Sequence, residues 1–332
     1  MKILITSGFL GAGKTTFIKE LIKRSGTFPV VLENEYGDNS IDADELRTKT
    51  SGKKELEVLE FMEGCVCCTM KDSFINSVLT VYSSLSPEYL IIEPTGVGRL
   101  SNIISNLTPI LHGDVTLLKP IVVLAPRSFK QNMAEFPELY KDQIANAQTV
   151  VFSKCENESY EILTETAEAI RAINPDAEII KEHYTGQSDA WWRSVMELPA
   201  NEAEISKPEG EADSFTQITI NNAHLNNPGE LIMLLEDCLR GVCGHVVRAK
   251  GTVPVGSDGC SMLRFDLADN LYSIGESPAA TNQCVFIGEY LDAAALHRRM
   301  GDDSFSDAPV WKAPQKLSKN RPVQPRYMAI TQ

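Results

Sequence analysis

The distribution of apolar residues changes along this chain and divides it into unlike parts. In the first part, short runs that are apolar on both faces alternate with amphipathic segments of helical period. Strands buried inside a parallel sheet have this character, and the segments between them are usually helices. The pattern predicts an α/β domain over residues 1–195, with a mainly parallel sheet and helices on both faces. The strand candidates are KILIT, PVVLENE, LEVLEFM, EYLIIEPT, KPIVVLA and TVVFSK, and the helix candidates are residues 15–24, 72–84 and 160–173.

Beyond residue 195 the pattern changes twice. Residues 196–214 contain ELPANEAEISKPEGEAD, which is rich in acids and poor in large apolar side chains, as exposed linkers are. Residues 215–300 then combine several strand-like runs with two helical segments, GELIMLLEDCLR and DAAALHRRM, and predict a small α+β domain. Residues 301–332 contain several prolines and little periodicity, so we expect a tail that is disordered or lies on a domain surface.

The length and charge of the chain narrow its function. A chain of 332 residues exceeds the usual size of one hydrophobic core, which favours two domains. Its 31 basic and 45 acidic residues give a net charge of −14, which disfavours a nucleic-acid partner. No apolar run reaches the roughly 20 residues that cross a bilayer, and we find no signal-peptide pattern. We therefore expect a cytoplasmic protein that binds neither nucleic acid nor membrane.

A glycine-rich loop follows the first predicted strand. The segment SGFLGAGKTT matches the pattern G-x-x-x-x-G-K-[ST] and leads into a predicted helix. In this pattern the backbone N–H groups surround the phosphates, Lys14 reaches the β and γ oxygens, and the Thr15 hydroxyl binds Mg²⁺. The loop predicts a P-loop NTPase domain with a nucleoside triphosphate site. The expected nucleotide-binding residues of the loop are Gly8, Gly11, Ala12, Gly13, Lys14, Thr15 and Thr16.

A second acidic motif lies at the end of the strand YLIIE. Glu93 is predicted to hold Mg²⁺, and Gly96 is predicted to present its N–H to a γ-phosphate, as in the D-x-x-G segment of many GTPases. With Lys14, these two residues form the predicted catalytic set. No glutamine follows EPTG to position an attacking water, so we expect slow unaided hydrolysis. Arg99 is a weaker candidate for a residue that stabilises charge during hydrolysis, and we interpret it as a solvated surface residue.

The strand TVVF leads into a segment that predicts base recognition. Ser153, Lys154 and Glu156 stand where many GTPases have N-K-x-D, in which the lysine stacks on guanine and the aspartate accepts its hydrogen bonds. The lysine and a carboxylate are kept, while the asparagine is lost and the acid is one methylene longer. Guanine is favoured, with looser base selectivity. An ATP-dependent kinase is an alternative, weakened because no acceptor-site base is recognisable.

The segment EGCVCCTM concentrates Cys65, Cys67 and Cys68 within four positions. Zinc prefers tetrahedral thiolate and imidazole ligands, and alternate residues of an extended segment share a face. Three thiolates leave an open position, which Glu35, Asp42 or a histidine could fill. A buried apolar turn and a redox switch are the alternatives. The other cysteines are scattered singly and are expected to be small buried side chains.

Taken together, these motifs resemble those of the CobW-like GTPases, P-loop proteins of the metallochaperone group. The resemblance implies a GTPase domain, a CobW C-terminal-like domain, GTP hydrolysis, and zinc or cobalt bound at the C-x-C-C cluster. It also places Glu35 in the N-E-[FY]-G switch motif of that family. This chain departs from the family in S-K-C-E and in having no histidine-rich stretch. The matching segments are GFLGAGKTT, ENEYGDNSID at 33–42, GCVCC at 64–68, EPTG at 93–96, KDQIANAQ at 141–148 and RAKG at 248–251.

The sequence thus predicts a slowly hydrolysing GTPase that handles a transition metal, with GTP, Mg²⁺ and Zn²⁺ or Co²⁺ as its ligands. The cysteine cluster lies between two segments that respond to a γ-phosphate, so nucleotide state is expected to control the metal site. The expected partner is a client metalloprotein, and a homodimer is possible. The alternative function is a nucleotide-switched accessory factor for a metallo- or corrinoid enzyme, without metal delivery.

Overall fold

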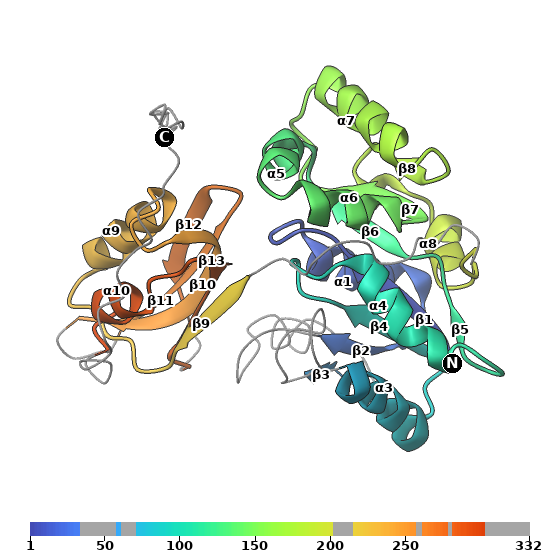
Figure 1. The fold of residues 1–332 in the computed structure, drawn as a ribbon, viewed down its shortest axis with the longest axis horizontal. Coiled ribbons are helices and arrows are strands. Elements are labelled where there is room, and N and C mark those ends of the chain that lie inside the picture. The colour runs from blue at the N-terminus through green and yellow to red at the C-terminus, as the bar shows by residue number, and fades with distance from the viewer. Residues whose placement is uncertain (34–57, 61–70, 202–214, 257–260, 278–280, 303–332) are drawn as a thin grey trace.

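The protein is described from a computed structural model, in which two sheets form two separate layers of structure (Figure 1). The residues that the structure describes are 1–33, 58–60, 71–201, 215–256, 261–277 and 281–302. The predicted linker and tail therefore lie largely outside the described residues, and the boundaries at 195, 214 and 300 stay predictions. In the described part, no helix has both the length and the apolar character needed to cross a bilayer.

The first sheet is parallel throughout and has the strand order β3-β2-β4-β1-β6-β7-β8, with β5 paired to β1. Its central strands are mostly apolar and are buried at every position, so both faces are covered, as the sequence predicted. The strands are β1 (Lys2–Ser7), β2 (Val30–Glu33), β3 (Val58–Glu60), β4 (Tyr89–Glu93), β5 (Thr116–Leu117), β6 (Ile121–Leu124), β7 (Thr149–Phe152) and β8 (Glu178–Ile180).

Helices cover both faces of this sheet because successive strand residues point to opposite sides. Ile3 and Ile5 of β1 join a core with α3, α4, α6 and α7, whereas Leu4 joins a core with α1 and α8. This arrangement confirms the predicted fold class of the first domain. The helices are α1 (Lys14–Ser25), α3 (Lys71–Leu85), α4 (Leu100–Leu107), α5 (Phe129–Glu135), α6 (Pro137–Ala145), α7 (Tyr160–Ile173) and α8 (Asp189–Val195), with short 3₁₀ turns at Thr108–Ile110, Pro126–Ser128 and Tyr184–Gly186.

The second sheet is antiparallel, with the order β12-β11-β10-β13-β9, and it confirms the predicted small α+β domain. Its strands alternate: Phe265 and Leu267 of β11 are buried against the helices, while Arg264 and Asp266 point away from them. The elements are β9 (Thr216–Ile220), α9 (Pro228–Leu239), β10 (His245–Val255), β11 (Ser261–Ala268), β12 (Leu271–Glu276), β13 (Gln283–Glu289) and α10 (Ala293–Arg299).

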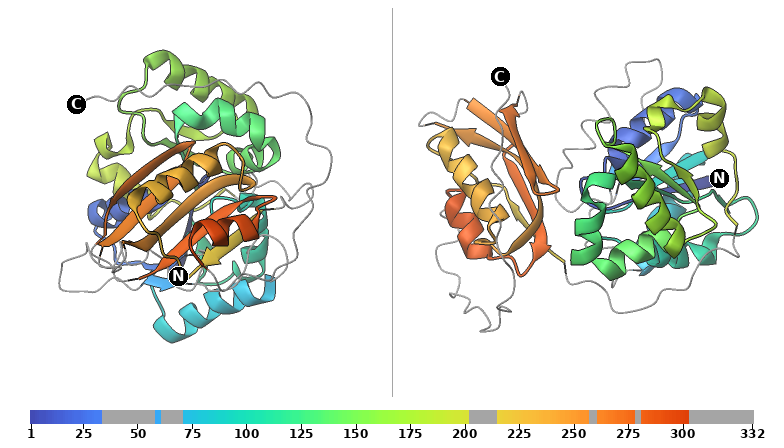
Figure 2. Two further views of the ribbon diagram at one scale, coloured as in Figure 1. Left: turned by 90° about the vertical axis from the view of Figure 1, so that its left-hand side faces the viewer. Right: turned by 90° about the horizontal axis from the view of Figure 1, so that it is seen from above.

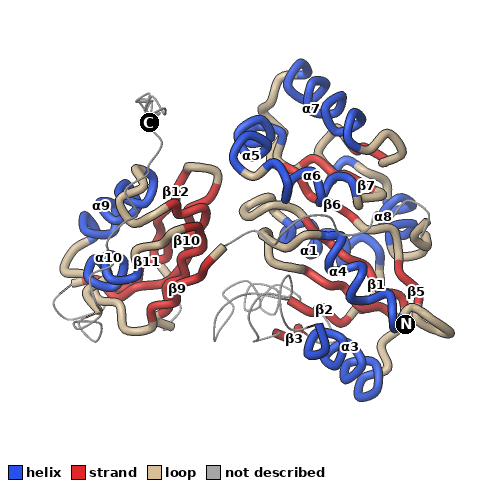
Figure 3. The backbone as a smooth tube through the Cα atoms, viewed as in Figure 1, coloured by secondary structure: helices blue, strands red, loops and turns tan. Residues whose placement is uncertain are grey.

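The helices of the second domain lie on one side of its sheet only. Figures 2 and 3 show α9 and α10 on the side away from the first domain, so the other face of the sheet is turned towards it. Val285 and Ile287 of β13 accordingly belong to the core cluster of the first domain. The imidazole of His245 stacks on the Phe136 ring, with centroids 5.5 Å apart. The two domains are therefore in direct contact.

Candidate nucleotide-binding site

The glycine-rich loop joins the end of β1 to the start of α1. Gly11 and Gly13 adopt φ angles of 76° and 90°, in the left-handed region that favours glycine. The helix begins at Lys14, directly after Gly13, which has no side chain to cap it. The first N–H groups of α1 and the positive end of its dipole are thus placed to receive an anion.

The side chain of Lys14 folds back over this loop. It is 7% exposed, and its Nζ donates hydrogen bonds to the carbonyl oxygens of Gly8 at 3.1 Å and Phe9 at 3.4 Å. A buried ammonium group held against loop carbonyls can turn to phosphate oxygens, which accept stronger, charge-assisted hydrogen bonds. The structure therefore brings Lys14 to the loop, where the motif expects it.

The two residues predicted to hold Mg²⁺ contact each other. The Thr15 hydroxyl donates to Oε1 of Glu93 at 2.8 Å, although 78 positions separate the residues in the chain. Glu93 ends β4 and is 9% exposed. A hydroxyl and a carboxylate are hard oxygen ligands, the type that Mg²⁺ prefers. Their chemistry and their adjacency fit this ion.

Glu33, a residue that the sequence analysis missed, lies beside Glu93. It ends β2, pairs in register with Glu93 and is 1% exposed. Val31 and Ile91 pack on the α1 side of the sheet, so the two glutamates, each two positions further on, point to that same side as Thr15. Neighbouring buried carboxylates repel each other, and a cation relieves that repulsion. The sequence could have indicated Glu33, because the strand VVLE ends in a glutamate just as the strand LIIE does.

The EPTG segment packs directly on the glycine-rich loop. A Cβ added to Gly96 would lie 2.3 Å from the backbone N of Leu10, so only glycine fits at this position. Gln143, 1% exposed, donates from Nε2 to the carbonyl oxygens of Gly96 at 3.2 Å and Gly98 at 3.1 Å. The structure thus brings Gly96 to the phosphate loop and braces its segment from α6.

Asp142, next to Gln143, supports the same segment. It accepts hydrogen bonds from the Ser101 N–H, at 3.2 Å, and from the Ser101 hydroxyl. Burial raises the pKa of Asp142 above its ordinary value, while the bonds from Ser101 and the charge of Arg99 oppose the rise. Arg99 itself is only 5% exposed, which corrects its interpretation as a solvated residue. The KDQIANAQ segment therefore acts as a brace for the loop that begins at Glu93.

Ser153 connects the base-recognition segment to the glycine-rich loop. Its hydroxyl donates to the carbonyl oxygen of Ala12 at 2.6 Å, and the residue is 2% exposed. The serine that replaces asparagine in the predicted motif thus anchors the end of β7 to the loop.

Lys154 and Glu156 take different partners. Lys154 has a φ of 51° and is half-exposed, and its Nζ lies 3.4 Å from Oδ2 of Asp269 in the second domain. Oε1 of Glu156 lies 3.1 Å from Nε2 of His183, and its side chain is 58% exposed, so the structure does not bring Glu156 into the cavity that Lys154 lines. Sequence reasoning missed Asp269, because no local pattern links it to a lysine 115 positions away.

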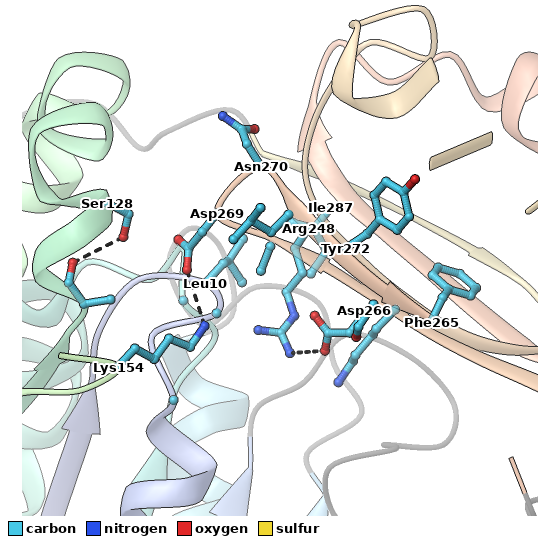
Figure 4. Close-up of a pocket in the computed structure, with 18 of the residues that line it drawn as sticks. Leu10, Ser128, Lys154, Arg248, Phe265, Asp266, Asp269, Asn270, Tyr272 and Ile287 are labelled. Carbon is cyan, nitrogen blue, oxygen red and sulfur yellow. Dashed lines mark hydrogen bonds and ion pairs between the residues drawn. The ribbon is translucent and has the colours of Figure 1, made fainter. Parts of the chain in front are cut away.

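A cavity of about 1710 Å³ lies between the glycine-rich loop, the EPTG segment and Lys154 on one side and the second domain on the other. It is large enough for a nucleotide, since ligand pockets commonly measure roughly 300–1,000 Å³. The second domain contributes cations from the face of its sheet that is turned towards the first domain, among them Arg248 (Figure 4). The charged lining residues include Lys14, Glu93 and Lys154 on the first domain and Arg248, Lys250, Arg264 and Asp269 on the second.

The predicted transition-metal ligands Glu35, Cys65, Cys67 and Cys68 lie outside the described residues. Within the described part of the chain, no group of three or more His, Cys, Asp or Glu side chains is arranged to hold a metal. Cys155, Cys238, Cys243 and Cys284 are reduced and buried, which confirms the expectation for four of the five scattered cysteines. The fifth, Cys260, lies outside the described residues.

Two family models match the chain over most of its length. Residues 2–181 match the CobW/HypB/UreG nucleotide-binding domain. The chain belongs to the CobW/HypB/UreG family. Residues 215–302 match the cobalamin synthesis protein cobW C-terminal domain. The CobW resemblance that the motifs indicated is confirmed.

Individual relatives share less than a third of their aligned residues with this chain. The zinc chaperone YeiR of Escherichia coli is 29% identical over 207 residues, covering 60% of this chain and 61% of the relative. The zinc-regulated GTPase metalloprotein activator 1 of Schizosaccharomyces pombe is 29% identical over 204 residues, covering 60% and 49%. The chain spans about half the length of the curated relatives it matches. The solved structure of Zn(II)-bound YjiA GTPase from E. coli is 17% identical, covers 91% of this chain and 98% of its own, and has a TM-score of 0.42.

Proposed function

We propose that the protein binds GTP with Mg²⁺, hydrolyses it slowly, and uses the cycle to handle zinc or cobalt for a client metalloprotein. The observation that carries the nucleotide part is the contact between Thr15 and Glu93 beside the glycine-rich loop. The metal part is supported by family membership and by relatives that are named zinc chaperones. We expect the protein to act in the cytoplasm, where cysteines stay reduced and able to bind metal.

The described residues of the site have different roles at the triphosphate. Lys14 and the N-terminus of α1 offset the phosphate charge, and Gly96 offers a backbone N–H close to the loop. Thr15 and Glu93 would hold Mg²⁺, which supplies electrostatic stabilisation to the transferring phosphoryl group when bound. The amide of Gln143, a buried residue that contacts the EPTG segment, is engaged with two carbonyls, which supports slow hydrolysis without a partner.

The proposed metal site is the C-x-C-C cluster with Glu35. In the sequence, Cys65 follows the end of β3 by five positions, and β3 lies beside β2 in the same parallel sheet as β4. The carboxyl ends of parallel strands meet at one edge, so the chain leaves β3 at the edge where Glu93 ends β4. This tether supports coupling between metal and nucleotide, by which each ligand changes the affinity for the other.

The nucleotide part is tested by measuring GTP and ATP binding with and without Mg²⁺. We expect GTP to bind more tightly than ATP, and Mg²⁺ to strengthen the binding. Glu93→Gln keeps the shape of the side chain but removes its charge, so it should abolish most of the Mg²⁺ effect. Equal affinity for both nucleotides would contradict the guanine assignment, and an undiminished Mg²⁺ effect in Glu93→Gln would contradict the role of Glu93.

The metal part is tested by titrating reduced protein with Zn²⁺, with and without a non-hydrolysable GTP analogue. Exchanging both Cys65 and Cys67 for serine should weaken zinc binding by several powers of ten, because a serine hydroxyl stays protonated where a thiolate binds. Cys284→Ala, which alters a buried cysteine outside the cluster, is the matched control. Unchanged zinc affinity in the double variant would remove the metal assignment and leave the accessory-factor alternative.

A further inference from the structure

The turn between β11 and β12 is a tight hairpin directed at the first domain. Ala268 pairs with Leu271, and the two residues between them, Asp269 and Asn270, have φ angles of 53° and 58°. Two-residue hairpins with positive φ at both central positions favour asparagine and aspartate, which tolerate that conformation. The turn is therefore a well-defined structure that holds its residues in fixed positions.

This hairpin turn touches the glycine-rich loop. A Cβ placed on Gly11 would lie 2.6 Å from the Cβ of Ala268 and 3.7 Å from Oδ2 of Asp269. Gly11 therefore lacks a side chain at the position where the second domain approaches the loop. The close approach explains why glycine is needed at Gly11, in addition to its φ of 76°.

The same turn places Asp269 on the lysine of the base-recognition segment. Oδ2 of Asp269 lies 3.4 Å from Nζ of Lys154, and the two side chains face each other in the cavity (Figure 4). The Asp269 side chain is 16% exposed, whereas that of Lys154 is 53% exposed. A carboxylate that is largely removed from water is stabilised by a cation at hydrogen-bonding distance, so this contact fixes the exposed end of the lysine.

We propose that Asp269 is a positioning residue of the nucleotide site, acting through Lys154. A lysine that stacks its stem on a base needs an acceptor for the ammonium group at its end. The nearby carboxylate of Glu156 contacts His183 instead, and the acceptor comes from the second domain. Nucleotide affinity consequently depends on the docking of that domain. This inference rests on the proposed nucleotide function and adds a residue to it.

The matched control for Asp269 is Asp237 on α9, an aspartate of the second domain that is 18% exposed and does not line the cavity. It pairs with Arg299, within its own domain, so Asp237→Asn removes an equal charge without touching Lys154. Dissociation constants for GTP, and for inorganic tripolyphosphate as a competitor that lacks a base, are measured in wild type, Asp269→Asn, Asp237→Asn, Lys154→Met and the double variant Lys154→Met with Asp269→Asn.

Asp269→Asn should weaken GTP binding about 3- to 10-fold, as expected for a partly exposed contacting pair, while Asp237→Asn changes it less than about 2-fold. Tripolyphosphate affinity should stay at the wild-type value in Asp269→Asn, because the lysine serves the base and not the phosphates. In the Lys154→Met background, Asp269→Asn should have no further effect, since the two residues act as one unit.

Three results would overturn the role of Asp269. Additive losses in the double variant would show that it does not act through Lys154. A parallel loss of tripolyphosphate affinity would indicate a general structural effect, and tighter GTP binding in Asp269→Asn would mean that the contact competes with the base. Failure of the proposed function itself would appear earlier, as absence of GTP binding by the wild-type protein.

Discussion

The two sheets of this protein differ in which of their parts can carry functional side chains. In the parallel sheet, all five residues of β4 are buried and both faces are covered by helices. In the antiparallel sheet, β11 alternates buried residues with others that point to the first domain. A sheet covered on both faces can present reactive groups only at its strand ends, whereas a half-covered sheet can offer a whole face.

The site reflects this difference. The first domain supplies Glu33, Glu93 and Ser153 from the ends of β2, β4 and β7. The second domain supplies Arg264 from the sheet face that carries no helices and Asp269 from the hairpin turn between β11 and β12. Residues from strand ends are set by the register of a buried sheet, while the contribution of a face depends on how two domains dock. The following predictions test this division.

The largest effect is expected from alanine substitutions at adjacent strand positions. Ile91→Ala and Ile92→Ala on β4 should each lower the free energy of unfolding by about 2–5 kcal/mol, because both faces of that strand are packed. On β11, Phe265→Ala should cost about 3–5 kcal/mol, and the adjacent Asp266→Ala less than about 1 kcal/mol. Urea unfolding followed by circular dichroism measures these differences. A tolerated substitution at either isoleucine would contradict a doubly covered sheet.

The next largest effect is expected on GTP binding at the glycine-rich loop, which follows the end of β1. Lys14→Ala should weaken GTP binding by about 30-fold or more, because removing a buried cation from a charged partner costs roughly 2–5 kcal/mol. The unfolding transition should be preserved, since Lys14 contacts loop carbonyls and not the apolar core. Lys23→Ala, at a 73% exposed lysine of the same helix, is the control for charge. Equilibrium binding of GTP measures the difference. If both variants bound GTP with wild-type affinity, the assignment of Lys14 to the phosphates would be contradicted.

A smaller effect is expected at the brace beneath EPTG. Gln143→Ala leaves two loop carbonyls without their amide donor, which should cost about 1–3 kcal/mol of stability and slow GTP turnover. Gln131→Ala, at an exposed glutamine on α5, should change stability by less than about 0.5 kcal/mol. Denaturant unfolding and steady-state turnover give the two readings. Unchanged turnover in a destabilised Gln143→Ala protein would limit the residue to a structural role.

The smallest effect is a pH dependence at the domain contact. The pKa of His245 is raised above its ordinary value, mainly by a hydrogen bond to Glu135 of the first domain; partial burial opposes the rise and Glu289 adds to it. A raised pKa means that the protonated imidazole stabilises the folded protein. This contribution is complete below the unfolded pKa, 6.5, and is lost as pH rises through the folded value.

Thermal unfolding of wild type and His245→Gln should therefore differ more at about pH 6 than at about pH 8, since protonation is linked to stability. The loss of the ring stack on Phe136 affects both conditions equally and cancels in the comparison. A difference that is constant or grows with pH would mean that the imidazole does not gain charge at the domain contact.

Much of the fold followed from the sequence because its signals are local. Strands apolar on both faces require a covered sheet, and alternation in the second domain requires a half-covered one. The glycine-rich loop and its lysine were also predictable, since loop, strand and helix are adjacent in the chain. Two interpretations needed the structure: Arg99 is buried, and Glu156 contacts His183.

The sequence by itself determined the fold class, the phosphate loop and the strand that ends in Glu93, because each depends on neighbouring residues and on periodicity. Only the tertiary structure placed Glu33 beside Glu93, since strand register joins segments 60 positions apart. It alone set Gln143 against Gly96 and Asp269 against Lys154. Such contacts depend on how helices pack on the sheet and how the domains dock, and these geometries arise from the summed packing of many residues, which no short motif encodes.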